Sequence, residues 1–202
     1  MPATVDPPRQ FSAKADSSAS GPKRVYADFS VYKGKAAMQL KIVSPTFELS
    51  QGSSPGLVVG RQGVVLLEFA NAQQGTGTSP GQRRYDWERK QNFALSAVEL
   101  AGLVEPHEQK YTHDPNITSS SKGNTMKNLT FNPNPQVQGG WFLSLQVQEG
   151  GQEAGRFAVP ISQGEMACLR VLAHSVIPHL LGFDRVMSTN VPNAPQGDGF
   201  LF

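Results

Sequence analysis

Hydrophobic and polar residues alternate with a period of two along much of the middle of the chain. The apolar positions of the clearest runs are Met38, Leu40 and Ile42; Leu129 and Phe131; and Trp141, Leu143, Leu145 and Val147. Their neighbours in the sequence are mostly small or polar, such as Gln39 and Lys41. Successive side chains of a β-strand point to opposite faces of its sheet, so each run predicts a strand with one buried face.

Turn-forming residues separate these runs. The chain holds 20 Gly and 15 Pro, and these cluster with Asn and Ser at residues 53–56, 75–81, 132–135, 139–140 and 150–151. Such clusters mark turns, and short connections of this kind join antiparallel strands. We therefore expect seven or eight antiparallel strands.

The strongest helix signal follows the last of these strands. Ser162 and Glu165 have the spacing of a capping box, in which each side chain accepts a hydrogen bond from a backbone N–H group at the start of the helix. Apolar residues then recur at helical spacing. Pro178 lacks a backbone donor and predicts a kink or a split, with a second piece that ends at Gly182. A shorter helix is expected over 97–104.

The two ends of the chain differ from its middle. Residues 1–23 are rich in Pro, Ser and Ala with few large apolar side chains, which predicts a disordered segment. That composition also suits the remnant of an organelle transit peptide. Residues 188–202 predict a flexible tail, and we expect the segment between them, 24–187, to fold as one domain.

Composition and motifs exclude several classes of function. One cysteine among 202 residues excludes an internal disulfide framework and a cysteine-cluster zinc site. No apolar run approaches the length of a transmembrane helix, so no membrane insertion is expected. No phosphate-binding loop or hydrolase motif occurs, and the four histidines lack the spacing of metal ligands. The sequence therefore predicts no enzyme, no metal and no cofactor. Cys168, among apolar neighbours, is expected to be buried.

Two segments, 32–35 and 85–93, combine aromatic and basic residues. Single-stranded nucleic acid needs both kinds of side chain, because cations neutralise its phosphates and flat rings stack on its unpaired bases. The alternative places Trp87 and Phe93 in the core, with the charges facing solvent. The apolar residues of 85–95 share one parity, which predicts a long strand or a bent pair of strands.

Several segments resemble the Whirly family of plants and algae. The matching motifs are Asp28-Phe29-Ser30-Val31-Tyr32, Lys33-Gly34-Lys35-Ala36-Ala37-Met38 (the family's K-G-K-A-A-L), Tyr85-Asp86-Trp87-Glu88-Arg89-Lys90-Gln91 (Y-D-W-x-R-K-Q), His113-Asp114-Pro115, Val159-Pro160-Ile161-Ser162 and Ile177-Pro178-His179-Leu180-Leu181-Gly182. They keep the family's order from about Tyr26 to Met187. Met38 replaces the usual leucine, a change that conserves volume. The loop at 73–82 looks longer than usual.

The resemblance implies an α+β, mainly β fold, in which two antiparallel four-stranded sheets pack crosswise with a C-terminal helix-loop-helix. It implies a homotetramer assembled through these helices, and higher assemblies of tetramers. It also implies single-stranded DNA binding with little sequence preference, in genome stability and transcription regulation. The implied compartment is the chloroplast nucleoid, with the mitochondrion or nucleus as alternatives. RNA binding in organelle RNA processing and an assembly or scaffold role are the alternative functions.

The resemblance also assigns roles to individual residues. The expected nucleic-acid contacts are Tyr32, Lys33, Lys35, Lys41, Tyr85, Trp87, Arg89, Lys90, Gln91, Asn92 and Phe93. In this set the rings stack on bases, the cations contact phosphates, and the two amides touch base edges. For Lys33 and Lys35, assembly contacts are the alternative. The expected oligomer core consists of Leu169, Leu172, Val176 and Leu180.

Overall fold

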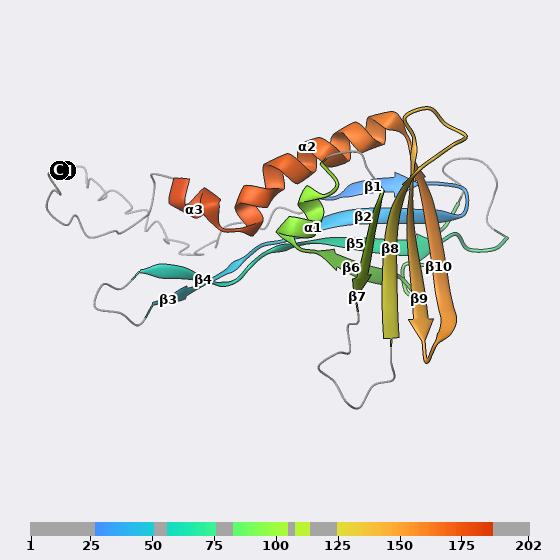
Figure 1. Ribbon diagram of the computed structural model, residues 1–202. Helices are drawn as coiled ribbons and strands as arrows, with labels where there is room; N and C mark the ends of the chain where they lie inside the picture. The colour runs from blue at the N-terminus through green and yellow to red at the C-terminus, as the bar shows by residue number, and fades with distance from the viewer. Residues whose placement is uncertain (1–26, 51–55, 76–82, 105–107, 114–124, 188–202) are drawn as a thin grey trace, which may run out of the picture.

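Two four-stranded antiparallel sheets and a long helix make up the body of the molecule (Figure 1). The computed structural model describes residues 27–50, 56–75, 83–104, 108–113 and 125–187. The expected disordered segment 1–23, the expected tail 188–202 and most of the loop 73–82 lie outside the described residues. The predicted fold class, with crossed antiparallel sheets and a C-terminal helical region, is confirmed.

The first sheet has the strand order β1-β2-β5-β6. Its strands are β1 (Phe29–Tyr32), β2 (Ala36–Val43), β5 (Val64–Asn71) and β6 (Gln91–Leu95). The predicted alternation holds at Met38 and Leu40, which are buried. Ile42, near the far end of β2, is 43% exposed, and Ala37 is buried although it lies on the opposite face of the sheet. Both faces of this sheet are therefore partly covered.

The second sheet has the order β10-β9-β8-β7. Its strands are β7 (Gln109–His113), β8 (Thr125–Pro133), β9 (Trp141–Glu149) and β10 (Gln152–Ile161). Buried residues occupy every second position of β9 from Trp141 to Val147, as the sequence predicts. Gly150 and Gly151 form the turn into β10 with φ values of 57° and 82°, a conformation that favours glycine.

The hydrophobic core lies between the crossed sheets (Figure 1). Phe69 and Leu67 reach it from the first sheet, and Phe131 and Leu143 from the second, each no more than 2% exposed. Helix α2 contributes a row of buried residues to the same cluster. Burial of these large side chains is the main stabilising contribution to the fold, because apolar area leaves water.

Three helices complete the domain: α1 (Ala97–Ala101), α2 (Gln163–Leu180) and α3 (Phe183–Met187). The predicted capping box of Ser162 and Glu165 is present at the start of α2. Of the kink or split predicted at Pro178, the split does not form, because α2 continues to Leu180, whereas the predicted end at Gly182 is confirmed. Pro178 lies in the last turn of α2, where the loss of one backbone donor interrupts little, and the break falls at Gly182 with φ 84°. No described helix is long and apolar enough to span a membrane.

The buried face of α2 packs within its own chain. Leu169, Val176 and Leu180 are 8% exposed or less and belong to the core cluster, while Leu172 is half-buried. The predicted oligomer-core role is therefore corrected for Leu169, Val176 and Leu180, which pack in the core of their own domain, while Leu172, outside that cluster, stays a prediction. Val171, 65% exposed, and Cys168 lie on the outward face of α2, so the expectation of a buried cysteine is also wrong.

A small hairpin, which the sequence patterns did not predict as a separate sheet, extends β2 and β5 away from the body (Figure 1). It consists of β3 (Thr46–Leu49) and β4 (Leu57–Arg61), and every residue of β4 is exposed. His179 ties this region to the helices: its Nδ1 lies 2.7 Å from Oδ2 of Asp184 and its Nε2 3.0 Å from Oγ of Ser44. The hairpin thus leaves the body from a hydrogen-bonded base.

Candidate nucleic-acid interface

The turn between β1 and β2 carries the two lysines of the Lys33-Gly34-Lys35 motif. The Lys33 amide donates to the carbonyl oxygen of Ala36 at 3.1 Å, which closes the turn. The Lys33 ammonium lies 2.8 Å from both carboxylate oxygens of Glu165, in the first turn of α2. The Lys35 side chain is exposed and has no hydrogen-bond or ion-pair partner among the described residues. The turn therefore presents one paired and one unpaired cation.

Three aromatic rings lie next to this turn. The Tyr32 and Tyr85 ring centroids are 5.4 Å apart, and the Tyr85 and Trp87 centroids are 6.5 Å apart. We call Tyr32, Tyr85 and Trp87 the aromatic row. The Tyr85 hydroxyl donates to the carbonyl oxygen of Lys33 at 2.7 Å, which fixes the row to the turn. Tyr32 is 55% exposed, so its ring is open to a ligand.

Backbone hydrogen bonds hold Tyr85 and Trp87 in this position. Tyr85 forms an isolated bridge with Ala72, and the Asp86 amide donates to the carbonyl oxygen of Asn71 at 2.9 Å. These contacts lay residues 84–87 along the end of β5, beside the turn that follows β1. Two motifs that are far apart in the sequence therefore form one surface.

Phe93 does not join the aromatic row. It is 2% exposed, and its ring stacks on His113 with the centroids 4.1 Å apart. The chain turns at residues 88–89 and β6 begins at Gln91, so the long strand, one of the two alternatives predicted over 85–95, does not form. Because the turn interrupts the alternation of side chains, Trp87 and Phe93 do not have to face the same side of the sheet. The prediction that Phe93 stacks on bases is therefore corrected, since its ring belongs to the core.

Lys41 and Lys90 both pair with Glu68, a carboxylate that the sequence analysis missed. Each ammonium lies 2.7 Å from one oxygen of this carboxylate. The Glu68 residue is only 4% exposed, on the middle of β5. An acid inside the apolar run Val64–Ala70 was the available signal, because a buried carboxylate needs cationic partners.

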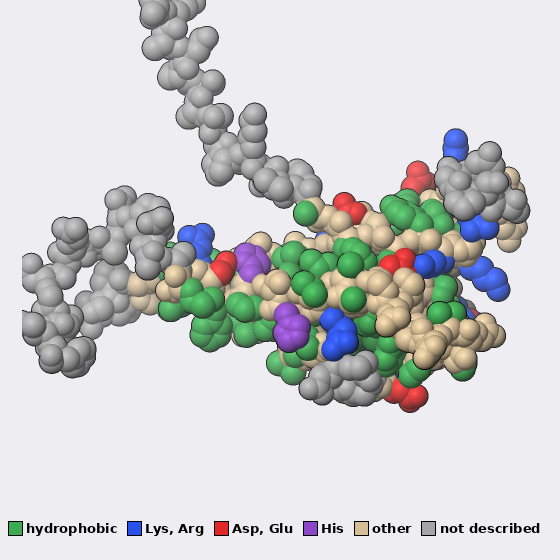
Figure 2. Space-filling model, turned by 90° about the horizontal axis from the view of Figure 1, so that it is seen from above, with side chains coloured by type: hydrophobic (Ala, Val, Ile, Leu, Met, Phe, Trp, Pro, Cys, Tyr) green, Lys and Arg blue, Asp and Glu red, His purple; other side chains and the backbone are tan. Residues whose placement is uncertain are grey.

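Arg89 is paired as well. Its Nε donates to Oδ2 of Asp86 at 2.6 Å. Of the five cations predicted to contact phosphate, Lys35 is thus the exception, and the other four have carboxylate partners. Figure 2 shows basic and acidic side chains interspersed at the end of the molecule where β1 turns into β2. The surface is therefore rich in charge but largely compensated.

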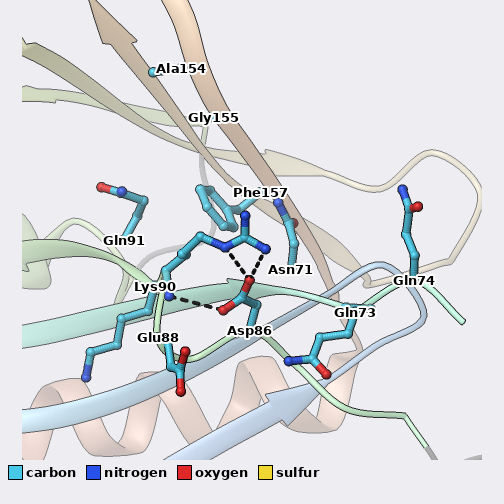
Figure 3. A pocket seen from close by; sticks show the side chains of 12 residues that line it. Asn71, Gln73, Gln74, Asp86, Glu88, Lys90, Gln91, Ala154, Gly155 and Phe157 are labelled. Atoms are coloured by element: carbon cyan, nitrogen blue, oxygen red, sulfur yellow. Dashed lines mark hydrogen bonds and ion pairs between the residues drawn. The ribbon is translucent and has the colours of Figure 1, made fainter. Parts of the chain in front are cut away.

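A groove of about 970 Å³ lies beside these residues, between the end of the first sheet and β10 (Figure 3). It is lined by residues 71–74, 86 and 88–91, and by Ala154, Gly155 and Phe157. Figure 3 shows Asn71 and Phe157 beside the ion-paired Asp86. Gln91 lines the groove, whereas Asn92 points to the opposite face of β6 and does not line it. The predicted pair of base-contacting amides is thus divided.

Glu165 predicts a pH dependence of stability. Burial raises the pKa of its carboxyl, but the hydrogen bonds from Lys33 and Ser162 outweigh burial and lower the pKa below its usual 4.5. A lowered pKa stabilises the fold above the unfolded-state value, and this contribution is lost as the pH falls through the folded-state value. We expect wild type to melt at a higher temperature than Glu165→Gln at neutral pH, with the difference shrinking below pH 4.5. A difference that stays constant down to strongly acidic pH would contradict the pairing.

The described residues hold no group of three or more His, Cys, Asp or Glu side chains placed to bind a metal ion. His113 pairs with Glu99 at 2.7 Å, and His179 pairs with Asp184. The chemistry that this surface offers is stacking on one exposed ring and two half-buried rings, hydrogen bonding by amides and a modest attraction for anions.

Comparisons with known proteins identify the family. A family model described as the Whirly transcription factor matches residues 31–172. Over 185 residues the chain is 33% identical to the mitochondrial single-stranded DNA-binding protein WHY2 of Arabidopsis thaliana, covering 89% of this chain and 72% of that protein. Over 178 residues it is 34% identical to the chloroplastic single-stranded DNA-binding protein WHY1 of Solanum tuberosum, covering 86% of this chain and 61% of that protein. The latter match thus spans less than two thirds of that relative.

Solved structures agree with the sequence matches. The crystal structure of WHY3 from Arabidopsis thaliana superposes with a TM-score of 0.71 at 31% identity, covering 82% of this chain and 94% of that chain. The structure of the plant transcriptional regulator PBF-2 gives a TM-score of 0.69 at 31% identity, covering 82% and 87%. The region matched by the family model includes the Lys33-Gly34-Lys35 turn, the aromatic row and Glu68. In sequence and in fold, this chain belongs to the Whirly family.

Proposed function

We propose that this protein is a non-enzymatic single-stranded DNA-binding protein that uses the aromatic row as its stacking platform. The observation that carries the proposal is the continuity of Tyr32, Tyr85 and Trp87 beside the Lys33-Gly34-Lys35 turn. Unpaired bases stack on such rings, whereas the bases of a duplex are already stacked on each other. Relatives at 33–34% identity are named single-stranded DNA-binding proteins, which supports the same ligand here.

The strand continues from the aromatic row into the neighbouring groove. There, Gln91 and the amides of Asn71, Gln73 and Gln74 offer both donors and acceptors to base edges. Amides of this kind accept many base orientations, and stacking tolerates every base. Binding therefore shows little sequence preference. Lys35 contributes attraction for a phosphate at the edge of the platform.

A homotetramer is the proposed assembly, and the structure offers an exposed apolar surface for it. Val171 of α2, Phe183 and Val186 of α3, and Leu49 of the hairpin are 56–81% exposed. Figure 2 shows hydrophobic side chains on the face of the molecule that carries α2. Apolar patches of this kind commonly mark subunit contacts, and closed symmetric assemblies are the usual way to bury them. Higher assemblies of tetramers would need further contacts.

The proposed compartment is a plastid or a mitochondrion, because the relatives are named chloroplastic and mitochondrial. Single-stranded DNA is exposed there whenever organelle DNA is copied, repaired or transcribed. Protection of those strands would maintain genome stability and would place the protein where it affects transcription, which agrees with the family description.

A competition titration tests the proposed function. A fluorescent single strand of about 30 nucleotides, long enough for several stacking sites, is challenged with unlabelled single strand, matching duplex and matching RNA at two salt concentrations. We expect the single strand to compete much better than the duplex at both concentrations. Equal and steeply salt-dependent competition by all three would overturn base stacking. Stronger competition by RNA than by DNA would instead assign RNA as the ligand.

A further inference from the structure

Glu68 occupies an unusual place for an acidic residue. It is the only Asp or Glu among the described residues that is buried, and it lies in the middle of β5. Its cross-strand neighbours are Gln39 on β2 and Asn92 on β6, so its side chain is on the face of the first sheet opposite Leu67 and Phe69. Lys41 and Lys90 reach it from either side.

The contacts of Glu68 have the geometry of a phosphate site. Each carboxylate oxygen accepts from one ammonium at 2.7 Å, as two oxygens of a phosphate group would. Both lysine side chains are partly exposed, at 41% and 35%, while the carboxylate is 5% exposed. The cations are thus within reach of a ligand, and the anion that neutralises them is beneath the surface.

The carboxylate is ionised at neutral pH. Burial raises the pKa of Glu68, but the hydrogen bonds and charges of Lys41 and Lys90 outweigh burial and lower it below 4.5. The cluster of two lysines and one carboxylate therefore carries a single net positive charge. Gln39, which could have donated to Glu68, donates instead to Asp28 at 2.7 Å.

We infer that Glu68 is a positioning residue that acts as an internal substitute for phosphate and limits charge-driven binding at this surface. This role rests on the proposed function, because Lys41 and Lys90 flank the surface assigned to the DNA strand. A carboxylate already bound to both ammonium groups must be displaced, or its charge overcome, before a phosphate gains their full attraction. Polyanions that bind by charge alone, such as duplex DNA, are therefore held weakly.

Replacement of Glu68 by glutamine tests this role directly. Glutamine keeps the size and one acceptor oxygen but removes the charge, so one more cation becomes available to phosphate. Each added phosphate contact steepens the dependence of log affinity on log salt by about 0.7 for a single strand and about 0.9 for a duplex. We expect the salt dependence of Glu68→Gln to steepen by these amounts for the single strand and for the duplex. Duplex affinity is expected to rise about tenfold at about 50 mM salt.

A double-mutant cycle with Lys90 separates this effect from a general change in the fold. In the wild-type background the Lys90 ammonium is held by Glu68 and not by a phosphate, so Lys90→Gln removes no phosphate contact and the salt dependence changes little. In the Glu68→Gln background the same substitution removes an available cation and lowers the slope by about 0.7 for a single strand. Lys35→Ala, which removes an unpaired cation, lowers the wild-type slope by about the same amount. The wild-type arm remains decisive even if Glu68→Gln folds poorly.

Glu48→Gln is the matched control. It removes one negative charge from the exposed hairpin, which lies at the opposite end of the first sheet from the turn between β1 and β2 in Figure 1, and we expect it to leave both slopes unchanged. The inference is overturned if the slope of log affinity against log salt is unchanged in Glu68→Gln. It is also overturned if Lys90→Gln lowers the single-strand slope by the full 0.7 or so in the wild-type background. Neither result would contradict single-strand binding itself. Failure of the wild type to bind single strands would overturn the proposed function and this role with it.

Discussion

Replacing both Tyr32 and Trp87 with alanine weakens binding to a single strand by about 30-fold or more. Each base stacked on an aromatic ring contributes about 1–3 kcal/mol, and every 1.4 kcal/mol corresponds to a tenfold change in affinity. Tyr32 and Trp87 are the outer rings of the aromatic row, and Tyr85 lies between them. Tyr85 itself is left in place because its hydroxyl holds the Lys33 turn. Fluorescence anisotropy at fixed salt measures the effect.

The aromatic substitutions have two controls. Val98→Ala removes an apolar side chain of α1 that is 81% exposed and belongs neither to the aromatic row nor to the proposed subunit surface, and single-strand affinity is expected to stay close to wild type. Tyr32→Phe with Trp87→Phe keeps flat rings and retains most of the affinity. Binding as tight as wild type by the double alanine variant would show that the strand takes another path.

Leu180→Ala destabilises the protomer by about 2–5 kcal/mol, the usual cost of removing a buried leucine and leaving a cavity. Leu180 is 0% exposed, and its carbonyl oxygen accepts from the Gly63 amide at 2.8 Å. The substitution removes side-chain contacts at the point where α2 meets the connection between β4 and β5. Urea unfolding at a fixed protomer concentration measures the loss, because oligomer stability depends on concentration.

Val171, on the outward face of the same helix, is expected to affect assembly and not the stability of the protomer. Val171→Glu places a charge on the outward face of α2, where the side chain is 65% exposed. We expect it to lower the molecular mass measured by sedimentation, from a tetramer of the 21.8 kDa chain toward the single protomer, while the protomer keeps its fold. Dissociation by Leu180→Ala without loss of protomer stability would instead restore Leu180 to the subunit interface.

Local patterns were sufficient for most of the framework. The alternation from Trp141 to Val147 predicted β9 and its buried face, because side-chain direction in a strand depends only on position along it. The spacing of Ser162 and Glu165 predicted the start of α2, and the same spacing at Ser96 and Glu99 marks the start of α1. The family motifs supported the crossed sheets, and the two motifs that combine rings with cations lie together on one surface.

The sequence predicted less well the roles of residues whose contacts lie far away along the chain. Trp87 and Phe93 have the same parity, yet a turn between them places one ring in the aromatic row and the other in the core. The apolar spacing of α2 showed that one face is buried, but it carried no information about whether that face packs on its own sheets or on another subunit. In the sequence Glu68 is an isolated acid. In the structure β2 places Lys41 beside it, and the segment after residue 86 places Lys90 beside it.

The sequence by itself determined which segments become strands and helices, which residues are apolar enough for the core, and which segments combine rings with cations. Only the tertiary structure decided which rings face outward together and which cations retain an uncompensated charge. The reason is physical. Backbone direction and capping act over a few residues, whereas ring contacts and ion pairs depend on strands separated by long stretches of chain, whose relative positions are set by packing of the whole core.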